Sequence, residues 1–185
     1  METLRPKQAP RFGMSKSTLY RATHAGKYER IARGIYRPSE APAADWDWIE
    51  AATRRPKATI CLTSALAYHD LTDAIPDALD IAIPRGSRAP SARAAINWHL
   101  FAKETFDLGR TEIAIPGSSL RIVSYSPERC IADAFRLRGD LGYELGRDAL
   151  REWLRRGGKP AQLMAIATRL PRTKSPLLQA LEALA

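Results

Sequence analysis

The alternation of hydrophobic and polar residues near the N-terminus predicts two short helices separated by a turn. The first helix begins at Leu4, the turn lies at Gly13, and the second helix runs from Ser15 to about Ala25. Ser15 is a favourable N-cap because its hydroxyl can accept a hydrogen bond from a free backbone amide. At about 100° per residue, the inward face of the second helix contains Thr18, Leu19, Ala22 and Ala25.

A β-hairpin is predicted directly after these helices. Residues that favour strands flank Gly34 between Lys27 and Arg37, and a turn at this glycine requires positive φ. Two helices followed by a hairpin are typical of a winged helix-turn-helix, which we place at residues 1–40. Because prolines shorten the first helix, its core must be completed by a helix over Asp45–Arg55, by the larger domain, or by sequence upstream of Met1.

The rest of the chain has the pattern of a larger mixed domain. Residues 39–44 are small, polar and proline-bearing, as expected of a linker. Strands are predicted at Leu79–Ile83 and Ile96–Phe101, and a hairpin at Glu112–Ile115 and Leu120–Tyr125. Helices are predicted at Asp45–Arg55, at Thr63–His69 with Thr63 as N-cap, after Ser126, and at Gly142–Arg156, Pro160–Leu170 and Ser175–Leu184. The fold class is therefore α+β, with a domain over residues 45–185 whose helices gather at its C-terminal end.

The distribution of charge distinguishes residues 1–40 from the rest of the chain. Residues 1–40 contain nine Lys or Arg and three Glu, so they carry +6 of the net charge of +9. Clustered positive charge favours a polyanionic partner, because neutralised phosphates release counterions. The N-terminus has no apolar run and no window is long enough to span a membrane. We therefore expect a cytoplasmic protein with no membrane partner.

The predicted module presents polar side chains where a DNA reader needs them. The outward face of the second helix carries Lys16, Ser17, Tyr20, Arg21 and His24. Arg33 would lie at the tip of the hairpin, with Arg30 and Arg37 along its strands. Such side chains suit phosphates and base edges together, so double-stranded DNA is the predicted partner. The alternative is a solvated hairpin with no ligand.

Two arginines outside the module are candidates for a second contact. Arg85 and Arg88 lie in a loop with few carboxylates nearby. The regularly spaced Arg147, Arg151 and Arg155 each follow a carboxylate by three residues, which favours a salt-bridged outer face instead.

Catalytic and metal-binding patterns are not evident. Cys61 and Cys130 have apolar neighbours, as expected of buried thiols in a reducing compartment, and the histidines lack ligand spacing. A nuclease would use some of the carboxylates Asp77, Asp80, Glu112, Glu128 and Asp133. The expected Glu-x-Lys pattern is missing, and Asp133 is better explained by pairing with Arg129 or Arg136. Ser64 with His69 would need a third partner, and His69 and His99 are expected to pack against the core. We therefore expect no enzyme activity, no cofactor and no metal.

Several segments, in order along the chain, resemble AbiEi-type antitoxins. They are residues 26–37, 63–69, 81–86 and 125–133. The resemblance implies the antitoxin of a type IV toxin-antitoxin pair, which represses its own operon through the winged helix and counters a nucleotidyltransferase-like toxin. It assigns DNA contacts to the recognition helix and to Arg30 and Arg33, on an operator that we expect to be an inverted repeat.

Two other functions fit the same residues. The chain could be a toxin-neutralising, protein-binding module with little DNA affinity, or a solitary transcriptional regulator. A nucleotidyltransferase-like reading frame beside the gene would separate an antitoxin from a solitary regulator.

Overall fold

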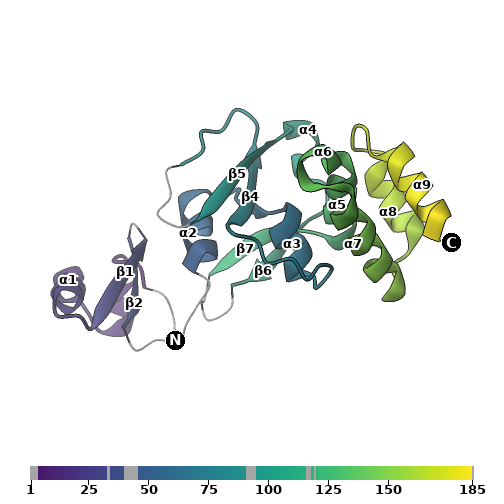
Figure 1. The fold of residues 1–185 in the computed structure, drawn as a ribbon. Helices are drawn as coiled ribbons and strands as arrows, with labels where there is room; N and C mark the ends of the chain where they lie inside the picture. The colour runs from purple at the N-terminus through teal and green to yellow at the C-terminus, as the bar shows by residue number, and fades with distance from the viewer. Residues whose placement is uncertain are drawn as a thin grey trace.

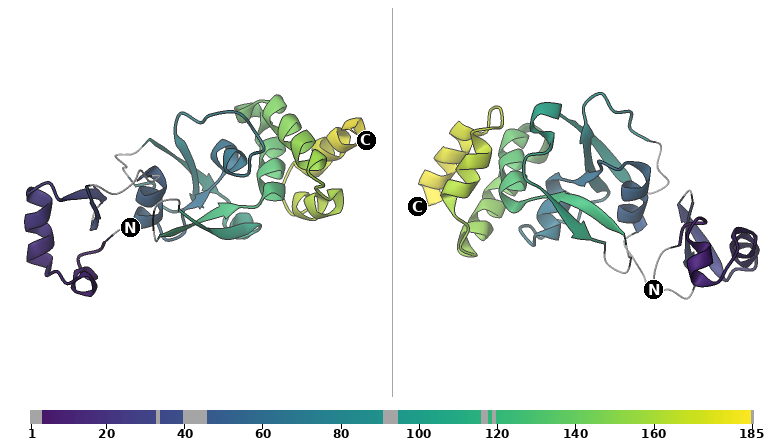
Figure 2. Two further views of the ribbon diagram at one scale, coloured as in Figure 1. Left: turned by 90° about the horizontal axis from the view of Figure 1, so that it is seen from below. Right: turned by 180° about the vertical axis from the view of Figure 1, so that it is seen from behind.

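The computed structural model describes residues 4–32, 34–39, 46–90, 95–115, 118 and 120–184. It confirms the α+β class: a small N-terminal module lies at one end, a mixed sheet follows, and helices gather at the other end (Figures 1 and 2).

The N-terminal module contains the predicted second helix, turn and hairpin. They are α1 (Lys16–His24), the turn at Gly13 with φ +69°, and the strands β1 (Tyr28–Ala32) and β2 (Ile35–Pro38). The Ser15 hydroxyl accepts a hydrogen bond from the Thr18 amide at 3.1 Å, so the predicted N-cap is confirmed.

The prediction of a first helix beginning at Leu4 is wrong. Between Leu4, where the described segment begins, and Gly13, the one helical element is a 3₁₀ turn, η1 (Ala9–Phe12). Leu4 instead pairs antiparallel with Tyr36, and the two reciprocal N–H···O distances are 2.7 and 2.9 Å. Pro6 and Pro10 explain the difference, because proline cannot donate the backbone hydrogen bonds of a helix interior. The segment therefore extends the hairpin before it turns.

The predicted inward face of α1 is partly confirmed. Leu19 is fully buried, and Thr18 and Ala22 are half-buried. Ala25 is exposed, because the helix ends at His24 and Ala25 serves as its C-cap.

A five-stranded mixed sheet forms the centre of the larger domain. Its strands are β3 (Thr59–Ile60), β4 (Leu79–Pro84), β5 (Ile96–Phe101), β6 (Arg110–Ala114) and β7 (Arg121–Tyr125), in the order β5-β4-β3-β7-β6. β4 is parallel to β5 and β3 is parallel to β7, whereas β3–β4 and β6–β7 are antiparallel. The strands predicted at β4 and β5 and the β6–β7 hairpin are confirmed. The central strand β3 was not predicted.

Eight helices of the described chain follow the N-terminal module. Their bounds are α2 (Trp46–Arg54), α3 (Leu62–Tyr68), α4 (Lys103–Phe106), α5 (Pro127–Arg136), α6 (Arg138–Leu141), α7 (Tyr143–Arg155), α8 (Pro160–Ala167) and α9 (Lys174–Leu184). Ser126 caps α5 as predicted. Thr63 does not cap α3, because that helix begins at Leu62 and has Cys61 at its N-cap position. The predicted helix start at Asp45 lies outside the described residues.

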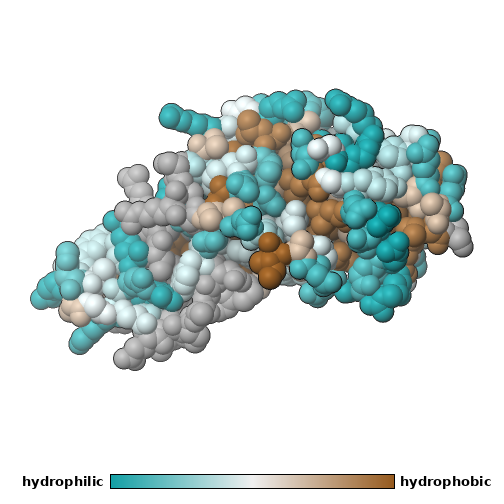
Figure 3. All heavy atoms as spheres, in the orientation of Figure 1, coloured by the Kyte–Doolittle hydropathy of each residue, from teal (hydrophilic) through white to brown (hydrophobic). Residues whose placement is uncertain are grey.

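The hairpin of the module packs on two sides. Tyr36 joins Leu4, Ala9 and Leu19 in a small core, whereas Ile35 belongs to the main core with α2 and the sheet. Adjacent strand residues face opposite sides, so one strand serves both cores. The larger domain therefore supplies the surface that the short first helix cannot. In Figure 3, the module presents mainly hydrophilic atoms and the apolar surface lies over the larger domain.

Candidate nucleic-acid interface

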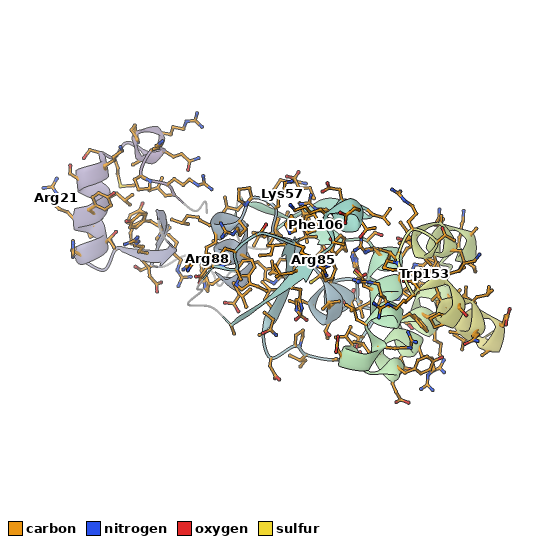
Figure 4. The ribbon with its side chains drawn as sticks, turned by 90° about the horizontal axis from the view of Figure 1, so that it is seen from above. Arg21, Lys57, Arg85, Arg88, Phe106 and Trp153 are labelled. Carbon is orange, nitrogen blue, oxygen red and sulfur yellow. The ribbon has the colours of Figure 1, made fainter. Side chains whose placement is uncertain are left out.

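The recognition-helix face predicted from the sequence is exposed. Lys16, Ser17, Tyr20, Arg21 and His24 all reach the surface of α1. At about 100° per residue they cover one continuous arc, on the side away from buried Leu19. Figure 4 shows Arg21 pointing away from the rest of the molecule. The helix therefore offers two cations, a hydroxyl, an imidazole and a phenol to solvent.

Local contacts hold two of these side chains. The Tyr20 ring packs edge-on against the Tyr36 ring, with centroids 5.9 Å apart, although Tyr20 is 45% exposed. The Ser17 hydroxyl lies 2.8 Å from the Ser15 hydroxyl at the helix N-cap. Tyr20 is thus presented by the hairpin that lies behind it.

The helix and the hairpin enclose a groove of about 530 Å³. Its lining residues are Tyr20, Thr23 and His24 of α1 together with Arg30, Gly34 and Tyr36 of the hairpin. Gly34 has φ +75°, as predicted for the turn. The structure therefore brings together three predicted contacts, Tyr20, His24 and Arg30, from segments that are separate in sequence.

Arg37 does not join this groove. It donates to Glu29 across the hairpin at 2.7 Å, and its guanidinium lies 4.0 Å from the centroid of the Trp46 ring in α2. Residues alternate between the two faces of a strand, so Arg37 lies on the same face as Ile35, toward the larger domain. Tyr36 and Arg30, which pair across the hairpin, lie on the opposite face. Arg37 thus fastens the hairpin to α2. Arg33 lies outside the described residues.

Four exposed cations of the module were not predicted as contacts. They are Arg5, Lys7, Arg11 and Lys27. With Lys16, Arg21 and Arg30, they have no ion-pair partner within the part of the chain that is described. The only available signal for them was the charge count of the first forty residues. Free cations of this kind suit the phosphate backbone, which carries no sequence information.

The two arginines predicted as a second contact are exposed to solvent. Arg85 and Arg88 are exposed, as is Lys57, and all three lie on the larger domain in Figure 4. The side chain of Arg55 donates to the Arg88 carbonyl and so ties the loop before β5 to the end of α2. By contrast, the arginines of α7 are ion-paired as predicted: Arg147 with Glu144, Arg151 with Asp148 and Arg155 with Glu152.

The carboxylates considered for a nuclease do not converge. Asp80 lies 2.9 Å from His99, and Glu112 pairs with Arg121 at 2.9 Å. Asp133 pairs with both Arg129 and Arg136, each at 2.8 Å, as its helical spacing predicted. Over the described ranges, no three His, Cys, Asp or Glu side chains are placed to hold a metal ion.

Ser64 and His69 do not form a pair. The Ser64 hydroxyl accepts from the Asp80 amide at 2.8 Å, whereas His69 Nε2 lies 2.7 Å from the Tyr125 carbonyl oxygen. Both side chains are therefore engaged with backbone of the core.

None of the helices in the described segments is both long and apolar enough to cross a membrane.

Comparisons with known proteins bear on the N-terminal module. Residues 1–39 match the family model described as "Transcriptional regulator, AbiEi antitoxin". No curated protein matches the chain. Among solved structures, the RV2827C protein from Mycobacterium tuberculosis is similar, with 12% identity and a TM-score of 0.49 over 98% of this chain and 90% of that chain. The module that carries the groove is thus similar to the family of AbiEi antitoxin transcriptional regulators.

Proposed function

We propose that this protein is a cytoplasmic transcriptional regulator that binds duplex DNA with α1 and the hairpin. The observation that carries the proposal is the groove in which Tyr20, His24 and Arg30 meet, within the segment that matches the regulator family. Helix side chains would read base edges in the major groove, and hairpin cations would hold adjacent phosphates. Arg85 and Arg88 are a second DNA contact in this proposal.

The direct test is a gel shift with the duplex upstream of the protein's own gene. We expect an inverted repeat to be bound, and we expect Lys16→Ala to weaken binding because an exposed, unpaired cation is lost. If Lys16 contacts phosphate, the loss should be similar for all sequences; if it contacts a base, specificity at one position should relax by about 1–3 kcal/mol.

Arg151→Ala is a matched control for this experiment. Arg151 is an exposed arginine like those of the module, but it lies on α7 and pairs with Asp148. Its removal should leave DNA affinity unchanged. Equal affinities for wild type, Lys16→Ala and Arg30→Ala would reject the proposed interface.

We further propose that the protein is the antitoxin of a type IV pair, represses its own operon, and counters a nucleotidyltransferase-like toxin through its larger domain. Support comes from the family match of the module and from the resemblance of residues 63–69, 81–86 and 125–133. Because the proposed DNA contacts on α1 and the hairpin lie outside this domain, the two activities should be separable by mutation of those contacts.

Co-expression with the toxin tests this separation in the full chain. A Lys16→Ala, Arg30→Ala double variant should lose promoter binding and still restore growth. The full chain is preferable to a fragment, since Ile35 belongs to the main core. Loss of rescue by a folded double variant would contradict the proposed division.

A further inference from the structure

A hollow of about 460 Å³ lies between α2, α3 and the segment that leads into β4. We propose that it binds an arginine side chain presented by a partner protein. Its chemistry comes from three aromatic residues, Trp46, Trp48 and Tyr68, and from the exposed carboxylate of Asp77. None of these residues lines the DNA groove, so this inference is independent of the DNA-binding proposal.

The aromatic wall favours a cation. The rings of Trp48 and Tyr68 are tilted against each other with centroids 5.5 Å apart, and Tyr68 is 39% exposed. The faces of aromatic rings carry negative potential and attract ammonium and guanidinium groups, most strongly at tryptophan. Trp46 already binds a guanidinium in this way, because Arg37 lies 4.0 Å from its ring centroid.

A carboxylate selects the charge of the occupant. Asp77 lines the hollow from the segment before β4 and is exposed to solvent. In a chain of net charge +9, this combination disfavours phosphate groups, which the module attracts. A planar guanidinium can stack on a ring and donate to a carboxylate at the same time, whereas an ammonium is a compact point charge. The hollow therefore fits arginine best.

The floor and the rim indicate that the arginine belongs to a protein. Ser64 lines the hollow and is buried, and its hydroxyl accepts a hydrogen bond from the Asp80 amide at 2.8 Å, so this side chain is fixed to β4. At the rim, Ile75 is 91% exposed beside Pro76. An arginine that a partner protein presents beside an apolar residue would bury this isoleucine at the same time.

Indole N–H signals provide the test in the full-length protein labelled with ¹⁵N. The probe is the peptide acetyl-Leu-Arg-Leu-amide, compared with the same peptide carrying neutral citrulline in place of arginine. We expect saturable shifts at Trp46 and Trp48, with Trp98 and Trp153 as internal references, and at least fivefold weaker binding of the citrulline peptide. Asp77→Asn should weaken binding about three- to fivefold, and Tyr68→Leu by a similar factor.

Asp73→Asn is the matched control, because Asp73 is an exposed aspartate of the same segment that does not line the hollow. It should bind the peptide as wild type does. Equal binding of the two peptides, absence of saturation, or tighter binding of adenosine monophosphate would each overturn the proposal. A dimer in sedimentation that Asp77→Asn dissociates would also overturn it, since the occupant would then be a second copy of this chain.

Discussion

At the residue scale, the centre of the larger domain is organised around one buried guanidinium. Arg129 is fully buried, and it donates to Asp133 at 2.8 Å and to the carbonyls of Thr105 and Leu108 at 2.6 and 2.9 Å. Its guanidinium also lies 4.3 Å from the centroid of the Tyr125 ring. A buried charge is tolerated only when partners of this kind compensate for lost hydration. The resembling segment 125–133 thus contributes this buried ion pair to the core of the larger domain.

Gly109 belongs to the same centre. It has φ +74°, and a Cβ at this position would lie 2.9 Å from the Cβ of Arg129. Glycine is therefore required there both by the backbone conformation and by the close approach of α5.

The buried thiols make stability fall at alkaline pH. Burial raises the pKa of Cys61 and of Cys130 well above the ordinary value of 9.0. Above about pH 9 the unfolded chain loses thiol protons that the folded chain keeps, so their contribution is full below that pH and is lost as pH rises toward the folded pKa values. Ionisation of each thiol in the unfolded chain should lower the free energy of unfolding by up to about 1.4 kcal/mol per pH unit in that range.

Urea unfolding between pH 8 and 10.5 measures this loss. Cys130→Ala should reduce the pH slope relative to wild type, whatever it does to absolute stability. An identical slope in the variant would show that the Cys130 thiol ionises equally in both states.

At the scale of elements, the hairpin β1–β2 joins the module to the larger domain. Tyr36 packs into the small core, Ile35 packs into the main core, and Arg37 stacks on Trp46 of α2. The wing is therefore held by two sets of contacts, and its orientation depends on α2.

Ile35→Ala should destabilise the main unfolding transition by about 2–5 kcal/mol, because it leaves a cavity in a core that includes the sheet. Thermal or urea unfolding followed by far-UV circular dichroism measures the shift. Leu178→Ala is a suitable control, because Leu178 is 42% exposed on α9 and its loss should change little. If Ile35→Ala left the main transition unchanged and melted only a minor fraction early, residues 1–40 would be an independent domain.

Local signals explain which elements the sequence could predict. Ser15 and Ser126 identify helix starts by their capping hydroxyls, and Gly34 identifies the turn of the hairpin. β3 could not be found, because two residues show no periodicity and their place at the centre of the sheet depends on pairing with distant β4 and β7. The pairing of Leu4 with Tyr36 is also non-local.

The candidate site was predictable to a similar extent. Helical periodicity identified the exposed face of α1, but the sequence assigned Arg37 to the same surface as Arg30. Strand register decides that question: the two residues occupy opposite faces of the hairpin. The role of Arg37 at Trp46 depends on the packing of α2, which no local pattern reveals.

At the scale of the whole molecule, the unpaired cations of the N-terminal module are separate from the acidic and aromatic hollow of the larger domain. Seven exposed cations without a described carboxylate partner surround the N-terminal module: Arg5, Lys7, Arg11, Lys16, Arg21, Lys27 and Arg30. The larger domain carries the aromatic and acidic hollow and the paired arginines of α7. A polyanion should therefore engage the module.

The salt dependence of DNA affinity tests this central claim most directly. Fluorescence anisotropy with the promoter duplex gives the slope of log K against log [salt], which is about −0.9 for each phosphate neutralised. Engagement of most of the seven cations predicts a wild-type slope of roughly −4 to −6, and Arg30→Ala should reduce its magnitude by about one. A slope near zero, or one that Arg30→Ala and Lys16→Ala both leave unchanged, would contradict the account.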